Sequence, residues 1–275
     1  MGVEAFRYDG KRVLVVGGAS GMGAATARTA ADLGAEVIVM DVADVTYPVA
    51  QSVKVDLRDR ASVDAAADAV SGPVHAAFLC AGVADGTPGI MLINFIAQRH
   101  LFERLVGSGT MGPGAAAAMI SSVAGLGWMS ALPVVTDFLD QDGWDAAAAW
   151  VAAHDGTDNY AFSKQAINAY VAREALPLLQ QGIRINAILP GPTDTPLARA
   201  NADLWLTFAA EYRAAAGVET LLPEQMANVL AFLCSDAASG ISGVTLLVDQ
   251  GHVNASLTGA WEADAPILKM LMGTG

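Results

Sequence analysis

A glycine-rich segment near the start of the chain separates a short apolar run from an alanine-rich segment. Residues 12–16 are mostly apolar, residues 17–23 read Gly-Gly-Ala-Ser-Gly-Met-Gly, and residues 23–33 have helical composition before Gly34. Glycine allows a tight turn and a close approach of backbone, so we predict a strand that turns directly into a helix. A strand–turn–helix unit at this position indicates an α/β chain.

The same alternation continues along most of the sequence. We predict further strands at 36–40, 52–55, 76–79, 115–120, 184–188 and 245–248, and helices at 61–70, 91–106 and 160–181. Alternating strands and helices form βαβ units around a parallel sheet. No repeat or low-complexity linker divides the chain, so we predict one domain over residues 1–275 with a seven-stranded parallel sheet.

Three segments depart from the alternation. Residues 126–158 form a long insertion, which either covers a site or contacts another subunit, and residues 144–154 within it have helical composition. Residues 195–217 are rich in aromatic side chains and are a candidate lid over the strand ends. The tail at 256–275 carries apolar residues that need burial, on its own cleft or on a partner subunit, and we favour the partner.

Composition restricts the partners that the chain can bind. With 53% hydrophobic and 16% charged residues, the chain can bury a large core. Its formal net charge of -13 would repel nucleic acid and anionic membrane surfaces, so we expect neither as a partner. A small molecule is the expected partner.

The cysteines and the start of the chain bear on the compartment. Cys80 and Cys234 lie in apolar runs, which indicates buried thiols in a reducing environment rather than disulfides. The first residues lack the apolar segment of a signal peptide, and no apolar run reaches the length of a membrane span. We therefore expect a cytoplasmic protein. The four histidines lack ligand spacing, and no metal site is predicted.

Tyr160 and Lys164 lie one turn apart near the start of the predicted helix at 160–181, on one face. A nearby ammonium favours the phenolate and lowers the pKa of the phenol from its usual value of about 10. The pair would then exchange a proton with an alcohol oxygen near neutral pH. The alternative is a surface tyrosine and lysine on an amphipathic helix, because this four-residue spacing is common.

The glycine turn can also bind a cofactor. Its backbone N–H groups, at the start of a helix, suit a pyrophosphate, although a loop can be glycine-rich for turn geometry alone. Asp41 ends the second predicted strand, eighteen positions beyond Gly23. A carboxylate there accepts hydrogen bonds from both ribose hydroxyls and repels a 2′-phosphate, which predicts NAD rather than NADP.

The glycine turn, the serine pair that ends the strand at 115–120, and the Tyr160/Lys164 pair follow one another in an order that resembles the short-chain dehydrogenase/reductase family. The resemblance extends over nearly the whole chain. It implies a single-domain Rossmann fold, doubly wound with helices on both faces of the sheet. It also implies a nicotinamide cofactor and reversible hydride transfer between a secondary alcohol and a ketone.

Site residues carried over from this family fall into two groups. Ser122 would hydrogen-bond the substrate oxygen, Tyr160 would be the acid/base, Lys164 would hold the nicotinamide ribose and lower the tyrosine pKa, and Asn94 would support a water relay. The implied cofactor-binding positions are Gly17, Ser20, Gly21, Met22, Gly23, Asp41, Asp56, Leu57, Ala81, Gly82, Tyr160, Lys164, Pro190, Gly191, Thr193 and Thr195.

Within the family, the chain is similar to bacterial 3α-hydroxysteroid dehydrogenase/carbonyl reductases and coniferyl-alcohol dehydrogenases. Residues 79–82, 120–124 and 184–197 carry this similarity, together with the long insertion. It implies a bulky hydrophobic alcohol or ketone as substrate, either cyclic, steroid-like or aromatic. Trp128, Met129, Trp205 and Phe208 would line its pocket, or else serve packing or subunit contact.

The family also implies a homo-oligomer, and we expect a homodimer or homotetramer. If the insertion packs over the helices at 91–106 and 160–181, it would obstruct the helix-to-helix dimer that is common in this family. The alternative function is a noncatalytic protein that senses or binds a dinucleotide on the same fold.

Overall fold

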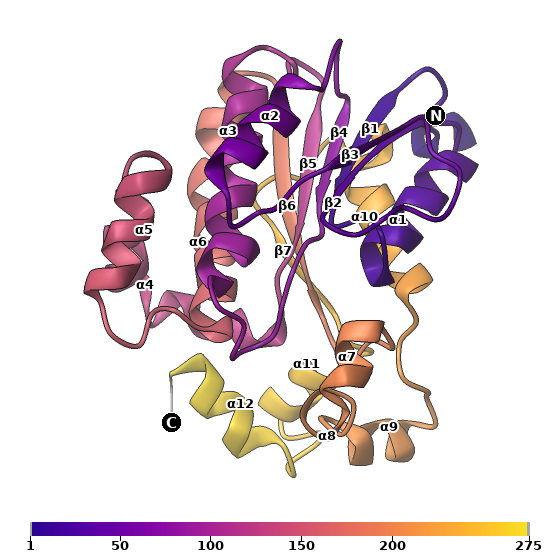
Figure 1. Cartoon of the computed structure of the whole chain (residues 1–275). Coiled ribbons are helices and arrows are strands. Elements are labelled where there is room, and N and C mark those ends of the chain that lie inside the picture. The colour runs from indigo at the N-terminus through magenta and orange to yellow at the C-terminus, as the bar shows by residue number, and fades with distance from the viewer. Residues whose placement is uncertain (1, 274–275) are drawn as a thin grey trace.

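The computed structural model of the chain describes residues 2–273 and has a parallel sheet between two layers of helices (Figure 1). The strands are β1 (Arg12–Val16), β2 (Glu36–Asp41), β3 (Gln51–Lys54), β4 (Ala76–Leu79), β5 (Ala116–Ile120), β6 (Arg184–Pro190) and β7 (Thr245–Val248). Their order is β3-β2-β1-β4-β5-β6-β7, and every pair is parallel. The prediction of a doubly wound, seven-stranded parallel sheet is confirmed.

Helices on the two faces bury the sheet. The main helices are α1 (Gly21–Asp32), α2 (Arg60–Asp68), α3 (Ala97–Gly107), α6 (Tyr160–Gln180) and α10 (Pro223–Cys234), with short 3₁₀ helices η1 (Val3–Phe6) and η4 (Asp236–Ala238). In Figure 1, α2, α3 and α6 lie on one face and α1 and α10 on the other. Successive residues of β1 alternate between the faces: Leu14 joins the core under α3 and α6, and Val15 the core under α1 and α10.

The sheet order places a topological switch beside β1. The chain winds from β1 toward β3 and then crosses to β4 on the other side of β1. Loops that follow β1 and β4 therefore diverge and leave a crevice at the carboxyl ends of these strands. In this fold a ligand is expected at that crevice.

The insertion forms two helices beside the long helices. A 3₁₀ segment, η3 (Val123–Met129), leads into α4 (Leu132–Leu139) and α5 (Gly143–Ala153), which contact α6 and α3 respectively. Phe138 of α4 and Trp150 of α5 are buried against one another, with ring centroids 5.2 Å apart. The packing of the insertion over α3 and α6 that the sequence suggested is therefore present.

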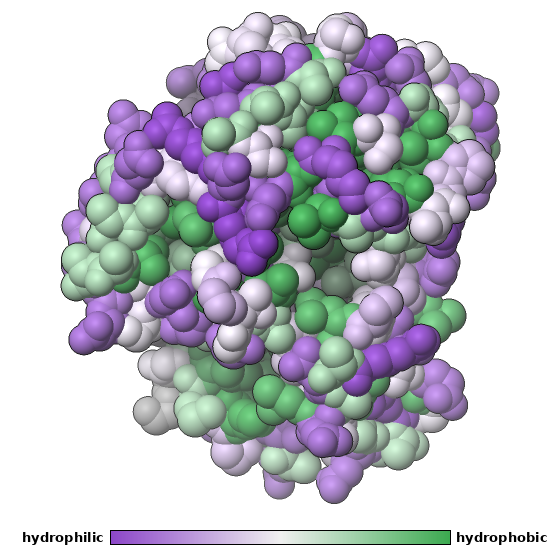
Figure 2. Space-filling view, in the orientation of Figure 1, coloured by the Kyte–Doolittle hydropathy of each residue, from purple (hydrophilic) through white to green (hydrophobic). Residues whose placement is uncertain are grey.

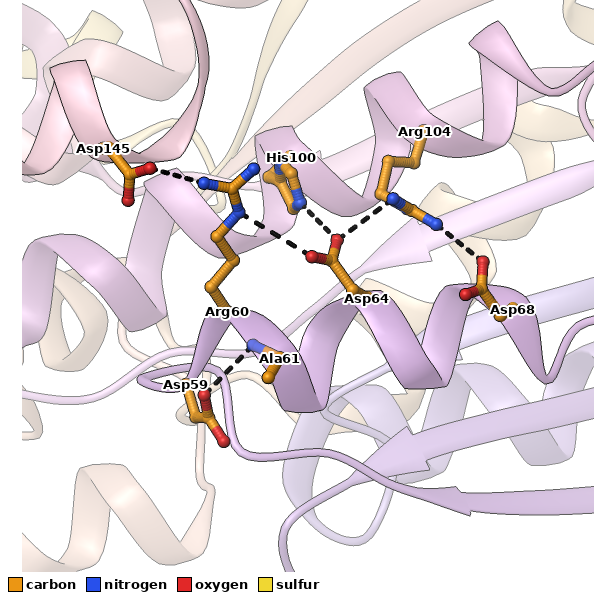
Figure 3. Close-up of polar contacts among 8 residues, drawn as sticks. All are labelled: Asp59, Arg60, Ala61, Asp64, Asp68, His100, Arg104 and Asp145. Carbon is orange, nitrogen blue, oxygen red and sulfur yellow. Dashed lines mark hydrogen bonds and ion pairs between the residues drawn. The ribbon is translucent and has the colours of Figure 1, made fainter.

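A polar network attaches α5 and α3 to α2 (Figure 3). Asp64 is its centre: one oxygen lies 2.7 Å from His100 Nε2 and 3.2 Å from Arg104 Nη1. Arg60 pairs with both Asp64 and Asp145 of α5, and Asp68 pairs with Arg104. The Asp64 carboxylate thus joins α2 to α3 directly, and Arg60 extends the network to α5.

Small helices gather at the carboxyl ends of the strands (Figure 1). They are α7 (Pro196–Ala200), α8 (Ala202–Trp205), α9 (Ala210–Ala216), α11 (His252–Leu257) and α12 (Ala265–Met272), which we call the small lobe. Figure 2 shows apolar side chains around a hollow between the small lobe and the body that holds the sheet.

Buried His252 connects the two segments of the small lobe. Its Nε2 lies 2.8 Å from Asp264 Oδ2, and Trp261 Nε1 donates to the same oxygen at 2.8 Å. The rings of Phe208 and Tyr212 pack on the histidine at 5.2 and 5.0 Å between centroids. Residues 195–217 and the tail therefore hold one another in place.

Several features differ from the sequence predictions. Helix α10 was not predicted, although Met226 and Leu230 give it an apolar face on the sheet. The helix predicted at 91–106 begins with a π-helical stretch, η2 (Leu92–Ile96), ahead of α3. The last two residues of the predicted tail lie outside the described residues. Within residues 2–273, no helix combines the length and apolar character that a membrane span needs.

Candidate active site

Two adjoining cavities lie at the carboxyl ends of the strands. The first, of about 390 Å³, runs from the ends of β2 and β3 across the glycine turn. The second, of about 360 Å³, extends from the ends of β4, β5 and β6 to the small lobe. Met22, Ala81, Gly82 and Thr195 line both, so the cavities form one continuous site.

The glycine turn builds the floor of the first cavity. Gly17 has φ +78°, and a Cβ there would lie 2.5 Å from Ala81 Cα in the loop after β4. A Cβ on Gly23 would clash with the carbonyl group of Gly17. The absence of side chains lets the turn close onto the start of α1, whose first N–H groups have no partner within the helix and suit an anion. Gly17, Ser20, Gly21, Met22 and Gly23 all line this cavity.

Asp41 lies at the far end of the first cavity. Its Oδ2 accepts a hydrogen bond from Ala19 N at 2.8 Å, and its Oδ1 accepts one from Ala43 N at 2.8 Å. These bonds fix the carboxylate between the glycine turn and the loop that follows β2. Carboxylate oxygens have further lone pairs, so Asp41 can still accept bonds from a ligand.

The loop after β3 completes this end of the cavity. Asp56 and Leu57 line it, as the sequence suggested, and Arg58 lines it beside them. Arg58 is bound by both oxygens of Asp56, at 3.0 and 2.8 Å, and this hydrogen bonding lowers the pKa of Asp56. The arginine charge is therefore already balanced by its neighbour.

Ser122, Tyr160 and Lys164 come together in the second cavity. Ser122 follows β5 and caps η3, its Oγ accepting from Ala124 N at 3.2 Å. Tyr160 opens α6, whose N-cap Asn159 accepts from Phe162 N at 2.9 Å. Lys164 lies one turn further, buried, with its Nζ 5.4 Å from the centre of the Tyr160 ring.

Burial dominates the electrostatics of this trio. The pKa of Tyr160 is raised to about 12 by burial; a hydrogen bond with Ser122 opposes the shift and the charge of Asp85 adds to it. Burial also lowers the pKa of Lys164 to about 8. Lys164 Nζ donates to the Ile120 carbonyl at 2.8 Å. Burial thus opposes the predicted lowering of the tyrosine pKa, Lys164 is not among the groups that shift this pKa here, and the lowering by Lys164 stays a prediction.

Asn94 lies beneath the site rather than in either cavity. It is buried in the π-helical stretch, where its Oδ1 accepts from Val83 N at 2.8 Å. Its Nδ2 donates to Val83 O at 3.1 Å and to Ser163 Oγ at 3.2 Å. In this structure Asn94 ties the loop after β4 to α6, and the water relay stays a prediction.

The loop after β6 lines the second cavity through Pro190, Gly191, Thr193 and Thr195. A Cβ on Gly191 would lie 3.0 Å from Asp249 Cα, so glycine lets this loop pass close to the end of β7. Thr195 Oγ1 accepts from Ala198 N at 3.0 Å and caps α7. These contacts hold the start of the small lobe against the cavity.

Apolar side chains of the small lobe form the outer wall. Trp205 packs on Tyr160 with ring centroids 5.1 Å apart, and Leu204 and Phe208 line the cavity beside it. From the tail, Ile267 and Leu271 reach the same cavity. Our preference for burial of the tail on a partner subunit is therefore wrong, because the tail covers the cleft of its own chain.

Sequence reasoning placed some wall residues correctly and missed others. Trp205 and Phe208 line the cavity, whereas Trp128 packs on the core and Met129 is exposed. Asp85, at the cavity rim, was missed. It follows β4 by a few residues, and the rule that parallel strands end at a common edge could have identified it. Among the described residues, no group of acidic, histidine and cysteine side chains has the arrangement of a metal site.

Comparisons with known proteins place the chain among dehydrogenases. Residues 145–253 match the family described as enoyl-(acyl carrier protein) reductase. The cis-4-hydroxycyclohexanecarboxylate dehydrogenase of Sinomonas cyclohexanicum is 36% identical, over 88% of this chain and 96% of that protein. The 3-alpha-hydroxysteroid dehydrogenase/carbonyl reductase of Comamonas testosteroni is 29% identical, over 87% and 95%. A structure of the 3-alpha-hydroxysteroid dehydrogenase from Pseudomonas sp. B-0831 complexed with NADH has a TM-score of 0.75 at 27% identity, covering 91% of this chain and 99% of that one.

Proposed function

Because the chain belongs to the short-chain dehydrogenase/reductase family of oxidoreductases, we propose that it is an NAD-dependent dehydrogenase that interconverts a hydrophobic secondary alcohol and its ketone. One observation carries the proposal. Ser122, Tyr160 and Lys164 meet in a cavity that is otherwise mostly apolar and that joins the cavity over the glycine turn.

The first cavity fits a dinucleotide. The turn closes so tightly that a Cβ on Gly17 or Gly23 would clash with neighbouring backbone atoms. The start of α1 at this turn suits a pyrophosphate. Asp41 would hold the adenosine ribose, and its charge disfavours the extra phosphate of NADP. The NADH bound to the hydroxysteroid dehydrogenase relative supports the same choice. The nicotinamide, when bound, supplies the acceptor or donor of the hydride.

Tyr160 would exchange the proton of the substrate oxygen, and Ser122 would hydrogen-bond that oxygen. With a pKa raised to about 12, Tyr160 holds its proton at neutral pH, which suits donation to a ketone. Alcohol oxidation needs the phenolate. The rate of oxidation should therefore rise with pH through the alkaline range, while ketone reduction should be favoured near neutrality.

The cavity walls support a cyclic or aromatic substrate. Leu204, Trp205 and Phe208 from one segment and Ile267 and Leu271 from the other give the space an apolar wall. Two relatives are named as dehydrogenases of cyclic alcohols, a hydroxycyclohexanecarboxylate and a hydroxysteroid. Residues 195–217 would act as the lid over this substrate.

The test is a panel of cyclic and aromatic secondary alcohols with the purified protein and NAD, followed by NADH absorbance. We expect turnover of at least one class and a preference for NAD over NADP. Tight NADH binding with no turnover of any alcohol or ketone would favour the noncatalytic dinucleotide-binding alternative instead.

A further inference from the structure

Asp85 places a carboxylate at the rim of the substrate cavity, beside the proposed acid/base. It lies in the loop after β4, and its Oδ1 accepts a hydrogen bond from the backbone N of Tyr160 at 2.7 Å. The side chain is exposed and lines the second cavity. Among residues 2–273, Oδ2 has no hydrogen-bond or ion-pair partner. The negative charge therefore lies at the edge of the space that a substrate would occupy.

Within the described part of the chain, the cavity is lined by no cation besides Lys164 that could balance this charge. Of the described residues that line it, Asp85 and Lys164 alone carry charged side chains. Lys164 is buried at the inner end, where its Nζ is held by the Ile120 carbonyl. The remaining wall toward the small lobe is apolar, with Trp205, Phe208 and Leu271 as examples. A substrate carboxylate in the outer part of the cavity would meet a like charge and no arginine or histidine.

We propose that Asp85 is a specificity-determining residue that makes the cavity select uncharged substrates and reject substrates that carry a carboxylate. The inference rests on the proposed function in one respect, that the second cavity is the substrate site. The inference specifies that the substrate is uncharged, which the apolar walls by themselves do not determine.

The expected discrimination is moderate. Two like charges a few ångströms apart at a partly solvated rim change a binding constant by about tenfold. Because Asp85 is exposed, salt should screen part of the effect, since the Debye length is about 8 Å at physiological ionic strength.

The experiment uses a matched ligand pair, 4-hydroxycyclohexanecarboxylate and its primary amide, which differ little in shape and differ in charge. Their binding to the full-length protein saturated with NADH is measured by titration calorimetry, so the result does not depend on turnover. The variant is Asp85→Asn, which keeps an oxygen to accept from Tyr160 N. The control is Asp155→Asn, the same change of net charge at an exposed residue that lines neither cavity.

We expect the wild type to bind the amide about tenfold more tightly than the carboxylate. Asp85→Asn should reduce this ratio to about twofold or less, mainly through tighter binding of the carboxylate, and Asp155→Asn should leave it unchanged. High salt should narrow the wild-type ratio, which tests the inference even if the variant does not fold. Equal binding of the two ligands by the wild type, an unchanged ratio in Asp85→Asn, or no binding of either ligand would overturn it.

Turnover of the same two ligands with NAD is measured separately. Discrimination in binding without turnover would remove the proposed dehydrogenase and leave the role of Asp85 standing. Turnover of both ligands without discrimination between them would support the proposed dehydrogenase and overturn the role of Asp85.

Discussion

Three neighbours of Tyr160 in the candidate site come from different parts of the chain. Ser122 follows β5, Asp85 follows β4, and Lys164 lies one turn along α6. The spacing of Tyr160 and Lys164 is readable in the sequence because a helix has a fixed period. The pKa of Tyr160 cannot be predicted from the sequence, because it depends on how deeply the small lobe and the strand ends bury the phenol.

Asp41 allows a direct test of cofactor choice. We expect Asp41→Asn to raise the preference for NADP relative to NAD by about tenfold, because the variant loses the charge that repels a 2′-phosphate. An amide oxygen at this position can still accept from Ala19 N, so the glycine turn should keep its shape. The measurement is kcat/KM for both cofactors with one alcohol.

The matched control for Asp41 is Asp44→Asn. Asp44 is exposed, pairs with Lys54 and does not line the first cavity. The control should keep the wild-type cofactor ratio. A ratio that stays unchanged in Asp41→Asn, or changes equally in both variants, would contradict the role given to Asp41.

At the scale of helices, the insertion is held by polar as well as apolar contacts. Trp144 of α5 packs edge-on against His100 at 5.7 Å between ring centroids, while His100 bonds to Asp64 of α2 (Figure 3). The hydrogen bond from His100 is the main cause of the lowered pKa of Asp64. A carboxyl whose pKa is lower in the folded than in the unfolded chain stabilises the fold at pH values above its unfolded pKa of about 3.9.

Asp64→Asn should therefore lower Tm at neutral pH by about 2–4 °C, as expected for a loss of roughly 1 kcal/mol in a chain of this size. The difference from the wild type should shrink as the pH falls through the pKa of Asp64, where the wild-type carboxyl is also neutral. Asp68→Asn removes a single pair with Arg104 from a more exposed position and should cost less. Thermal melts across pH check this, and a difference that grows in acid would count against it.

The strands and the helices α1, α2, α3 and α6 could be predicted because their apolar patterns are local, whereas α10 was missed. Residues 12–16, 76–79 and 245–248 were placed to the residue, and the other strands to within two residues at each end. The course of the tail could not be predicted in this way. Its apolar residues require burial, but the choice between its own cleft and a partner depends on where β5, η3 and α11 bring Val123 and Val253 to meet Leu268.

The candidate site was predicted in its inner part and less well at its rim. The glycine turn, Ser122, Tyr160 and Lys164 carry residue types at fixed positions relative to strand ends, so their meeting follows from the sheet order. Leu204 and Ile267 come from small helices whose directions have no short sequence signal, so their place became clear only from the folded chain. Asp85 follows β4, and the common edge at which parallel strands end could have indicated its place.

At the scale of the whole molecule, the position of the insertion limits how subunits can assemble. Helices α4 and α5 lie over α6 and α3, which covers the face on which a helix-to-helix dimer would form. We therefore expect an oligomer that is not built on α3 and α6, with the mass of a homodimer in light scattering as the simplest result. The variant Leu176→Cys, on an exposed position of α6, should form no disulfide between subunits. An efficient cross-link there, or a tetramer joined through these helices, would contradict this expectation.

The central claim is that Tyr160 moves a proton in a hydride-transfer reaction on a hydrophobic alcohol. The most direct measurement compares NADH formation by the wild type and Tyr160→Phe on the best alcohol of the panel, with NADH binding measured on both proteins. We predict that kcat falls by about 10²- to 10⁴-fold, the usual contribution of a general acid/base, while NADH affinity changes little. A variant that binds NADH and keeps full turnover would contradict the account.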